Sequence, residues 1–85
     1  MKQFVLYSRS YCHLCEDLLQ ALEALRVECR FNVEVIDVDT DEALIALYDE
    51  LVPVLMGRRA DGGLLQLCHY HFNEAAARAF LLHEQ

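Results

Sequence analysis

The chain has 85 residues, 55% hydrophobic and 25% charged, which is typical of one small folded domain and excludes a disordered or fibrous chain. Its formal net charge is -7 and its seven basic residues are scattered along the sequence, which argues against nucleic-acid binding. No apolar run approaches the ~20 residues of a transmembrane helix, and the first run is too short for a signal peptide, so we expect a cytoplasmic protein without membrane association.

The first half of the chain predicts a strand, a helix and a second strand. Residues 3–8 form a short apolar and aromatic run, which favours a buried strand. Leucines then recur every three or four residues, which predicts an amphipathic helix. The apolar stripe of this helix would consist of Leu14, Leu18, Leu22 and Leu25. Residues 31–39 predict the second strand, with Phe31, Val33 and Val35 alternating against polar neighbours.

The second half predicts a helix, a hairpin and a final helix. Thr40 and Asp41 are N-cap candidates for a helix over residues 42–48. Its apolar face would hold Leu44, Leu47 and Tyr48. Two β-favouring runs, 52–56 and 64–70, are joined by a glycine-containing loop and predict a hairpin. Asn73 would cap a helix over residues 74–83, with Ala76, Ala79, Phe80 and Leu81 or Leu82 facing the core.

The expected element order is therefore β-α-β-α-β-β-α in one domain over residues 1–85. The first β-α-β unit should be right-handed, with its two strands parallel, and the terminal hairpin should add the antiparallel part of a mixed sheet. This arrangement gives an α/β fold in which three helices flank four strands.

Cys12 and Cys15 form a Cys-x-x-Cys motif that opens the first predicted helix, directly after a strand and a short loop. Cysteines three residues apart face the same side of a helix and can close a disulfide. Free N–H groups and the dipole at a helix N-terminus stabilise a thiolate, so we expect the pKa of Cys12 to fall below the roughly 8.5 of a free cysteine. His13 and Arg9 would add positive charge, whereas Glu16 and Asp17 would act in the opposite sense.

At this place in a βαβ pattern the motif predicts thiol–disulfide exchange. Cys12, nearer the helix end and the solvent, would attack a substrate disulfide, and Cys15 would resolve the mixed disulfide. The alternative is a non-catalytic binding module that holds zinc or an iron–sulfur cluster through the same two cysteines.

The other two cysteines are interpreted as packing residues, Cys29 near the end of the first helix and Cys68 in the last strand. Cys68, His69 and His71 could complete a zinc site, but alternation along a strand would turn Cys68 away from both histidines.

Three stretches carry a resemblance to a known family. Leu6–Cys15 has a strand, a loop and a helix start, with the basic Arg9 three positions before the first cysteine; Val33–Asp39 is a strand with an acidic exit; Leu51–Val54 contains Val-Pro. They resemble the glutaredoxin branch of the thioredoxin superfamily, especially small bacterial glutaredoxin-like proteins. The resemblance implies a thioredoxin-like (glutaredoxin-type) three-layer α/β/α sandwich with a four-stranded mixed sheet.

The resemblance also implies a substrate-binding loop at Val52 and Pro53. In glutaredoxins this proline is cis, a form available at low cost only before proline, and its loop lies against the cysteine pair. The N–H and C=O of Val52 would then bind the extended chain of the substrate. Arg9, Tyr11 and His13 are further substrate-binding candidates, because they flank the first cysteine.

The chain departs from glutaredoxins at two places. His-Leu stands between the cysteines in place of Pro and Tyr or Phe, and residues 69–74 replace the Gly-Gly-x-Asp-like helix start that holds the glutathione carboxylate. We expect no resident cofactor and no metal, and keep glutathione only as a candidate reductant. The expected partners are a disulfide-containing protein or small thiol substrate and a cellular reductant. We expect the protein to be a monomer that serves cell redox homeostasis.

Overall fold

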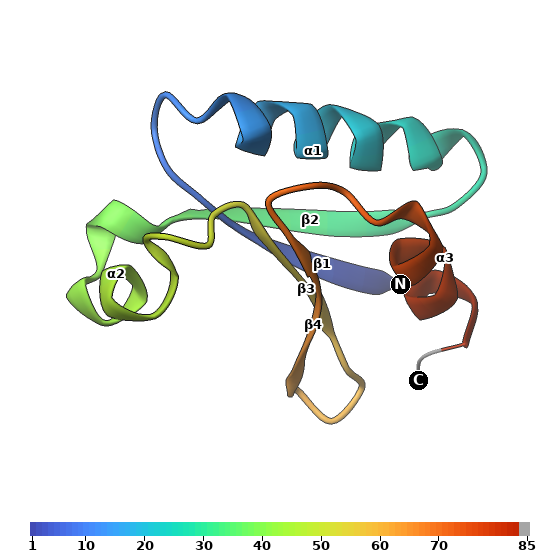
Figure 1. The fold of residues 1–85 in the computed structure, drawn as a ribbon. Helices are drawn as coiled ribbons and strands as arrows, with labels where there is room; N and C mark the ends of the chain where they lie inside the picture. The colour runs from blue at the N-terminus through green and yellow to red at the C-terminus, as the bar shows by residue number, and fades with distance from the viewer. Residues whose placement is uncertain (84–85) are drawn as a thin grey trace.

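The computed structural model describes residues 1–83 and contains the predicted order of elements (Figure 1). These are β1 (Lys2–Ser8), α1 (His13–Ala24), β2 (Phe31–Asp37), α2 (Glu42–Tyr48), β3 (Val54–Arg58), β4 (Leu64–His69) and α3 (Glu74–His83), with short 3-10 helices η1 (Leu25–Val27) and η2 (Val38–Thr40). The last two residues of the predicted domain, 84 and 85, lie outside the described part. Within residues 1–83, no helix combines the length and apolarity needed to cross a bilayer.

The four strands form one mixed sheet in the order β2-β1-β3-β4. β1 and β2 are parallel, whereas β3 pairs antiparallel with both β1 and β4. The predicted parallel unit and terminal hairpin are therefore confirmed. Tyr7 near the end of β1 pairs with Val54 at the start of β3, so the segment after β1 and the segment before β3 meet at the same end of the sheet.

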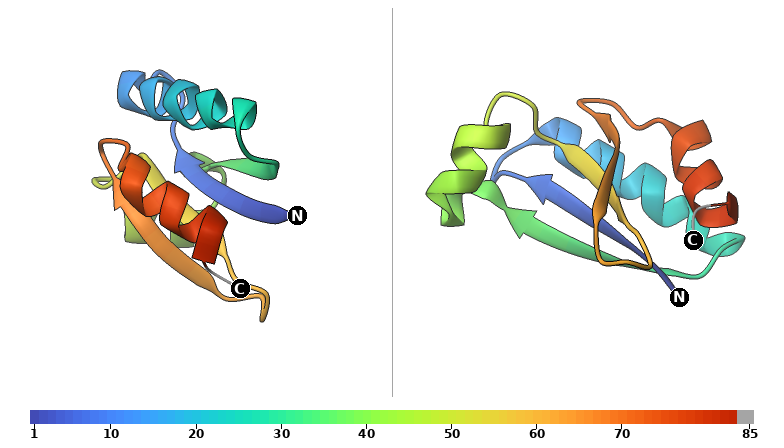
Figure 2. Two further views of the ribbon diagram at one scale, coloured as in Figure 1. Left: turned by 90° about the vertical axis from the view of Figure 1, so that its right-hand side faces the viewer. Right: turned by 90° about the horizontal axis from the view of Figure 1, so that it is seen from below.

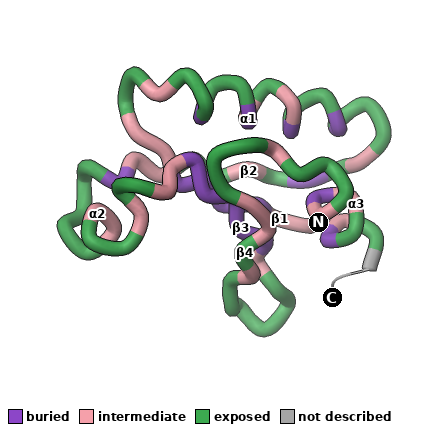
Figure 3. Tube along the Cα trace, viewed as in Figure 1, coloured by how far each residue is buried: buried purple, intermediate pink, exposed green. Residues whose placement is uncertain are grey.

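Each face of the sheet carries its own apolar core. On one face Phe4, Leu6 and Leu55 pack with residues of α1 and α3, including Leu18 and Phe80. The other face carries a second cluster, against which α2 packs through Leu44 and Tyr48. The cluster consists of Val5, Tyr7, Val38, Val54 and Met56. Burial is concentrated in β1 and β3, the two central strands (Figure 3). Two views place α2 and α3 at opposite ends of the sheet, with α1 along one face (Figures 1 and 2).

Local capping sets the boundaries of the helices. The Asp41 carboxylate accepts the N–H of Ala43, and the Asn73 amide oxygen accepts the N–H of Ala76, so the predicted caps at Asp41 and Asn73 are confirmed. The other candidate, Thr40, does not cap α2, because it lies in η2 and its hydroxyl donates to the carbonyl oxygen of Asp37. The second strand was predicted to reach residue 39 but ends at Asp37. The Asp37 carboxylate accepts the N–H of Asp39 and turns the chain into η2, which is why the strand stops there.

Several predicted core positions are wrong, because tertiary packing rotates the elements. In α1 the buried stripe begins at Cys15, and Leu14 is exposed. Val35 is 51% exposed and lies near the end of β2, which is an edge strand of the sheet. In α2 Leu47 points to solvent, and only Leu44 and Tyr48 reach the core. In α3 the buried alanine is Ala77 and not Ala76 or Ala79, whereas Phe80 is buried as predicted. Of the two alternatives Leu81 and Leu82, Leu81 packs against the core.

Candidate functional site

The turn between β1 and α1 presents Cys12 at the beginning of a helix. Tyr11 has φ 61°, in the left-handed region, and this conformation redirects the chain from the strand into the helix. Cys12 is the N-cap of α1: its Sγ accepts the N–H of Cys15 at 3.1 Å, and its carbonyl oxygen accepts the N–H of Glu16 at 3.2 Å. The N–H of Cys15 is therefore placed to stabilise a thiolate at Cys12.

Cys12 and Cys15 are joined by a disulfide, with their Cα atoms 5.2 Å apart. That separation lies within the usual range for disulfides, so the bond closes without displacing the backbone. The two sulfurs differ in access, because Cys15 is 5% exposed beneath the helix start whereas Cys12 is only half-buried. Cys12 is accordingly the sulfur that an incoming thiol or disulfide can reach.

A pocket of about 200 Å³ opens beside the disulfide. It brings together the predicted site residues Arg9, Tyr11, Cys12 and Cys15, whereas His13, Val52 and Pro53 do not line it. Its remaining lining residues are Leu6, Ser8, Ser10, Glu16, Leu19 and Val35. The pocket lies on the β2 side of the site, which explains why Val35 is open to solvent.

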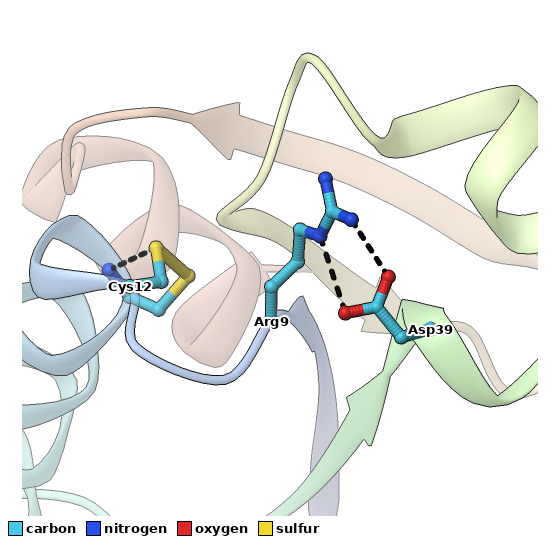
Figure 4. The surroundings of a disulfide bond; sticks show 4 residues. Arg9, Cys12 and Asp39 are labelled. Atoms are coloured by element: carbon cyan, nitrogen blue, oxygen red, sulfur yellow. Dashed lines mark hydrogen bonds and ion pairs between the residues drawn. A yellow bond between two sulfur atoms is a disulfide. The ribbon is translucent and has the colours of Figure 1, made fainter.

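Arg9 does not act as a free positive charge next to Cys12. Its guanidinium donates to both carboxylate oxygens of Asp39, at 2.8 and 3.3 Å (Figure 4). This hydrogen bond and the attraction to the carboxylate raise the pKa of Arg9 above its usual value. Because Asp39 offsets the charge of Arg9, the favourable electrostatics at Cys12 come chiefly from the helix N-terminus.

Sequence reasoning missed Asp37 and Asp39 as parts of this site. Ser10 donates a hydrogen bond to the Asp37 carboxylate at 3.4 Å, and Asp39 holds Arg9. A signal was present, since β1 and β2 were predicted to be parallel and parallel strands end at the same edge of a sheet. The register confirms this geometry by pairing Ser8 with Asp37.

The Val52–Pro53 peptide bond is cis, the form that the resemblance implied. The antiparallel register places this loop at the same end of the sheet as the turn that follows β1. The N–H of Val52 already donates to the carbonyl oxygen of Tyr48 at 3.1 Å, and the carbonyl oxygen of Pro53 accepts the N–H of Tyr70 at 2.9 Å. Pairing with a substrate through both backbone groups of Val52 would require the first of these bonds to open.

The remaining cysteines lie apart from the disulfide. Cys29 and Cys68 are free thiols, and both pack against the core under α1 and α3. Burial raises the pKa of the Cys68 thiol, partly offset by a hydrogen bond from the backbone of Asn73. Among residues 1–83, no group of three or more His, Cys, Asp or Glu side chains is placed to hold a metal ion, so Cys68 and its neighbouring histidines do not complete a site with Cys12 and Cys15.

Comparison with known proteins gives one family and a consistent set of structures. Residues 3–82 match the model of the glutaredoxin-like domain. A protein of Nitrosomonas europaea, solved by NMR, is 36% identical with a TM-score of 0.81, over 94% of this chain and 91% of its own. A crystal structure from X. campestris is also 36% identical, with a TM-score of 0.57, over 92% of this chain and 93% of its own. No curated protein matches the chain.

More distant structures share the fold. Fasciola hepatica thioredoxin is 24% identical with a TM-score of 0.64, over 99% of this chain and 81% of its own. Oxidised mitochondrial thioredoxin 3 of Saccharomyces cerevisiae is 16% identical with a TM-score of 0.66, over 94% of this chain and 76% of its own. At these identities the likeness shows the fold alone, an α/β thioredoxin fold with a disulfide at the start of α1 in the present chain.

Proposed function

The chain belongs to the glutaredoxin-like domain family of the thioredoxin superfamily, as its sequence resemblance implied, and on this premise we propose that it is a thiol–disulfide oxidoreductase. Cys12 is the attacking thiol and Cys15 the resolving thiol. Substrate disulfides are reduced while this pair is oxidised.

One observation carries the proposal: the two sulfurs of a redox-type pair sit at the start of α1 with unequal access. Cys12 is the half-buried N-cap, and Cys15 lies buried one turn deeper, with its N–H donating to Cys12 Sγ at 3.1 Å. In the reduced protein the same N–H and the helix dipole favour the thiolate of Cys12. An accessible nucleophile directly above a shielded second thiol is the arrangement that a two-step exchange requires.

The exchange proceeds in two steps. The Cys12 thiolate attacks one sulfur of the substrate disulfide, forming a mixed disulfide and releasing the other sulfur as a thiolate, which takes up a proton. The Cys15 thiol loses its proton and attacks Cys12 Sγ, which breaks the mixed disulfide and releases the second substrate thiol. The substrate has gained two electrons, and the Cys12–Cys15 disulfide of the structure is the oxidised product.

The substrate is expected to be a disulfide-containing protein or a small disulfide that docks on the Cys12 side. Tyr11, fully exposed beside Cys12, supplies an aromatic flank, and the carbonyl oxygen of Val52 is an acceptor for an extended substrate chain. A cellular reductant must then return two electrons to the pair. Glutathione is one candidate; in place of the glutaredoxin carboxylate-holding motif, the start of α3 has Asn73, whose side chain caps the helix.

The test is a redox titration of the metal-free protein in glutathione or dithiothreitol buffers. We expect one reversible two-electron transition between roughly -120 and -300 mV. A Cys15→Ser variant, which cannot resolve, should accumulate a mixed disulfide at Cys12 that mass spectrometry detects. Cys29→Ser is the matched control, since it removes a free thiol outside the site and should leave the transition unchanged.

The competing binding module makes the opposite prediction. It would purify with a stoichiometric metal held by Cys12 and Cys15, would lose structure on chelation and would show no reversible dithiol–disulfide couple. Either the absence of the couple or trapping at a cysteine other than Cys12 would overturn the oxidoreductase assignment.

A further inference from the structure

A second, larger pocket lies at the end of the sheet opposite the disulfide. Its volume is about 470 Å³. The lining residues are Met1, Lys2, Gln3, Arg30, Arg58, Arg59 and Ala60. Four of the chain's seven basic residues therefore line one pocket, with no acidic residue among the lining, although the formal net charge of the protein is -7. We call this feature the basic pocket.

Strand pairing brings these distant basic residues together. Lys2 pairs with Phe31 in the parallel β1–β2 ladder, which places Arg30 beside the start of β1. Gln3 pairs with Arg58 in the antiparallel β1–β3 ladder, which places the end of β3 at the same end of the sheet as the start of β1. Three separate segments thus meet there, and the cluster is a property of the register.

Three basic residues of this pocket, Lys2, Arg30 and Arg58, differ in their pairing from the arginines elsewhere. The three arginines outside the pocket each meet a carboxylate: Arg9 with Asp39, Arg26 with Glu23, and Arg78 with Glu28 and Glu74.

In contrast, no ion pair within residues 1–83 involves Lys2, Arg30 or Arg58. The Lys2 ammonium lies 5.1 Å from the centre of the Phe80 ring, and Arg58 donates a long hydrogen bond of 3.4 Å to the carbonyl oxygen of Gly62. Clustered like charges repel one another, so their mutual repulsion is relieved by an anion that binds among them.

We propose that the basic pocket binds a small molecule that carries two or more linked phosphate groups. The planar guanidinium groups of Arg30 and Arg58 match phosphate oxygens with paired donors, and Lys2 adds a point charge. A pocket of about 470 Å³ has the size of a small-molecule site. A nucleic-acid polymer fits poorly, because the net charge of -7 repels it and the cations form a pocket and not a track.

The proposal is independent of the redox function and is tested on the oxidised protein. Inorganic tripolyphosphate is titrated at low salt while backbone amide signals are followed by NMR. We expect saturable shifts at Lys2, Gln3, Arg30 and Arg58, no shift at Cys12, and affinity that falls as salt rises. Orthophosphate should bind at least about tenfold more weakly, since it offers fewer charge-assisted hydrogen bonds.

Variants locate the site. Arg58→Gln and, separately, Arg30→Gln should each weaken tripolyphosphate binding by about tenfold. Arg30 is exposed, and its side chain makes no hydrogen bond or ion pair within residues 1–83, so its replacement tests the site even if Arg58→Gln unfolds. Arg78→Gln is the control, because it removes one positive charge outside the pocket and should leave affinity within about twofold of wild type. Unsaturable binding, equal affinity for both anions, or equal losses in all three variants would overturn the proposal.

Discussion

The two ends of the sheet carry pockets that differ in the number of basic side chains and in the carboxylates that pair with them. At the disulfide end the one basic lining residue, Arg9, is neutralised by Asp39, and Glu16 also faces the pocket. At the other end Lys2 and Arg58 stand without a carboxylate partner within residues 1–83. The same four strands therefore support a site governed by a helix N-terminus and a site governed by side-chain cations.

This difference in charge indicates which kind of ligand each pocket would bind. A disulfide is neutral, so the pocket beside Cys12 needs no strong field, and the α1 N-terminus supplies the local stabilisation that a thiolate requires. No thiol, hydroxyl or carboxyl side chain lines the basic pocket, and charge is its main means of recognition. Perturbing one end should therefore leave the other unchanged.

The largest expected effect comes from removing the nucleophile. Cys12→Ser should reduce disulfide-reducing activity by about 1000-fold or more, because the hydroxyl neither ionises nor attacks sulfur at neutral pH. Turnover of a disulfide-linked peptide measures the loss. Tripolyphosphate binding to the same variant should match that of wild type, and a parallel loss of both would show that the two ends are not separate.

The next largest effect concerns the core below the basic pocket. A Cβ placed at Gly57 would come within 2.5 Å of the Phe80 ring, whose face also lies near Lys2. Gly57→Ala should lower the free energy of unfolding by roughly 1–3 kcal/mol, because Phe80 must move in a packed core. Urea denaturation measures this change.

Gly63→Ala is the matched control for that experiment. Its nearest new contact would be the Asp61 carboxylate at 3.1 Å, on an exposed turn, so the destabilisation should be clearly smaller. Equal destabilisation by the two variants would contradict the assignment of a tight contact between Gly57 and Phe80.

A smaller effect is expected from unbalancing the Arg9–Asp39 pair. Asp39→Asn leaves the Arg9 charge without its partner beside the pocket, so alkylation of reduced Cys12 at pH about 7 should accelerate by about two- to fivefold. Arg9→Gln leaves Asp39 unpaired and should slow it. If both variants react at the wild-type rate, the pair holds the loop without influencing the charge at Cys12.

The smallest effect tests the core between the two ends through pH. Burial raises the pKa of Cys68, so the unfolded chain loses this proton first, and the free energy of unfolding should fall as pH rises past the ordinary thiol value. Urea midpoints measured from about pH 7 to about pH 10 in wild type and Cys68→Ala report it. The wild type should lose more stability than the variant; parallel curves would count against the raised pKa.

The sequence by itself determined the order of the elements and the place of the reactive cysteines. These features depend on neighbours a few residues apart, such as the Asp41 and Asn73 caps, the alternation that marks strands, and a Cys-x-x-Cys that follows a strand and opens a helix. Residues a few positions apart can adopt only a few relative geometries, so these local patterns could be predicted from the sequence alone.

Only the tertiary structure decided which distant residues meet. Arg9 and Asp39 are 30 positions apart, and the parallel register of β1 and β2 puts them at one end of the sheet. There Asp39 offsets the positive charge that Arg9 was expected to supply near Cys12. The same register, with the antiparallel pairing of β3, gathers Lys2, Arg30 and Arg58 at the opposite end. A scattered set of charges reveals its grouping only once strand pairing fixes which backbone positions lie side by side.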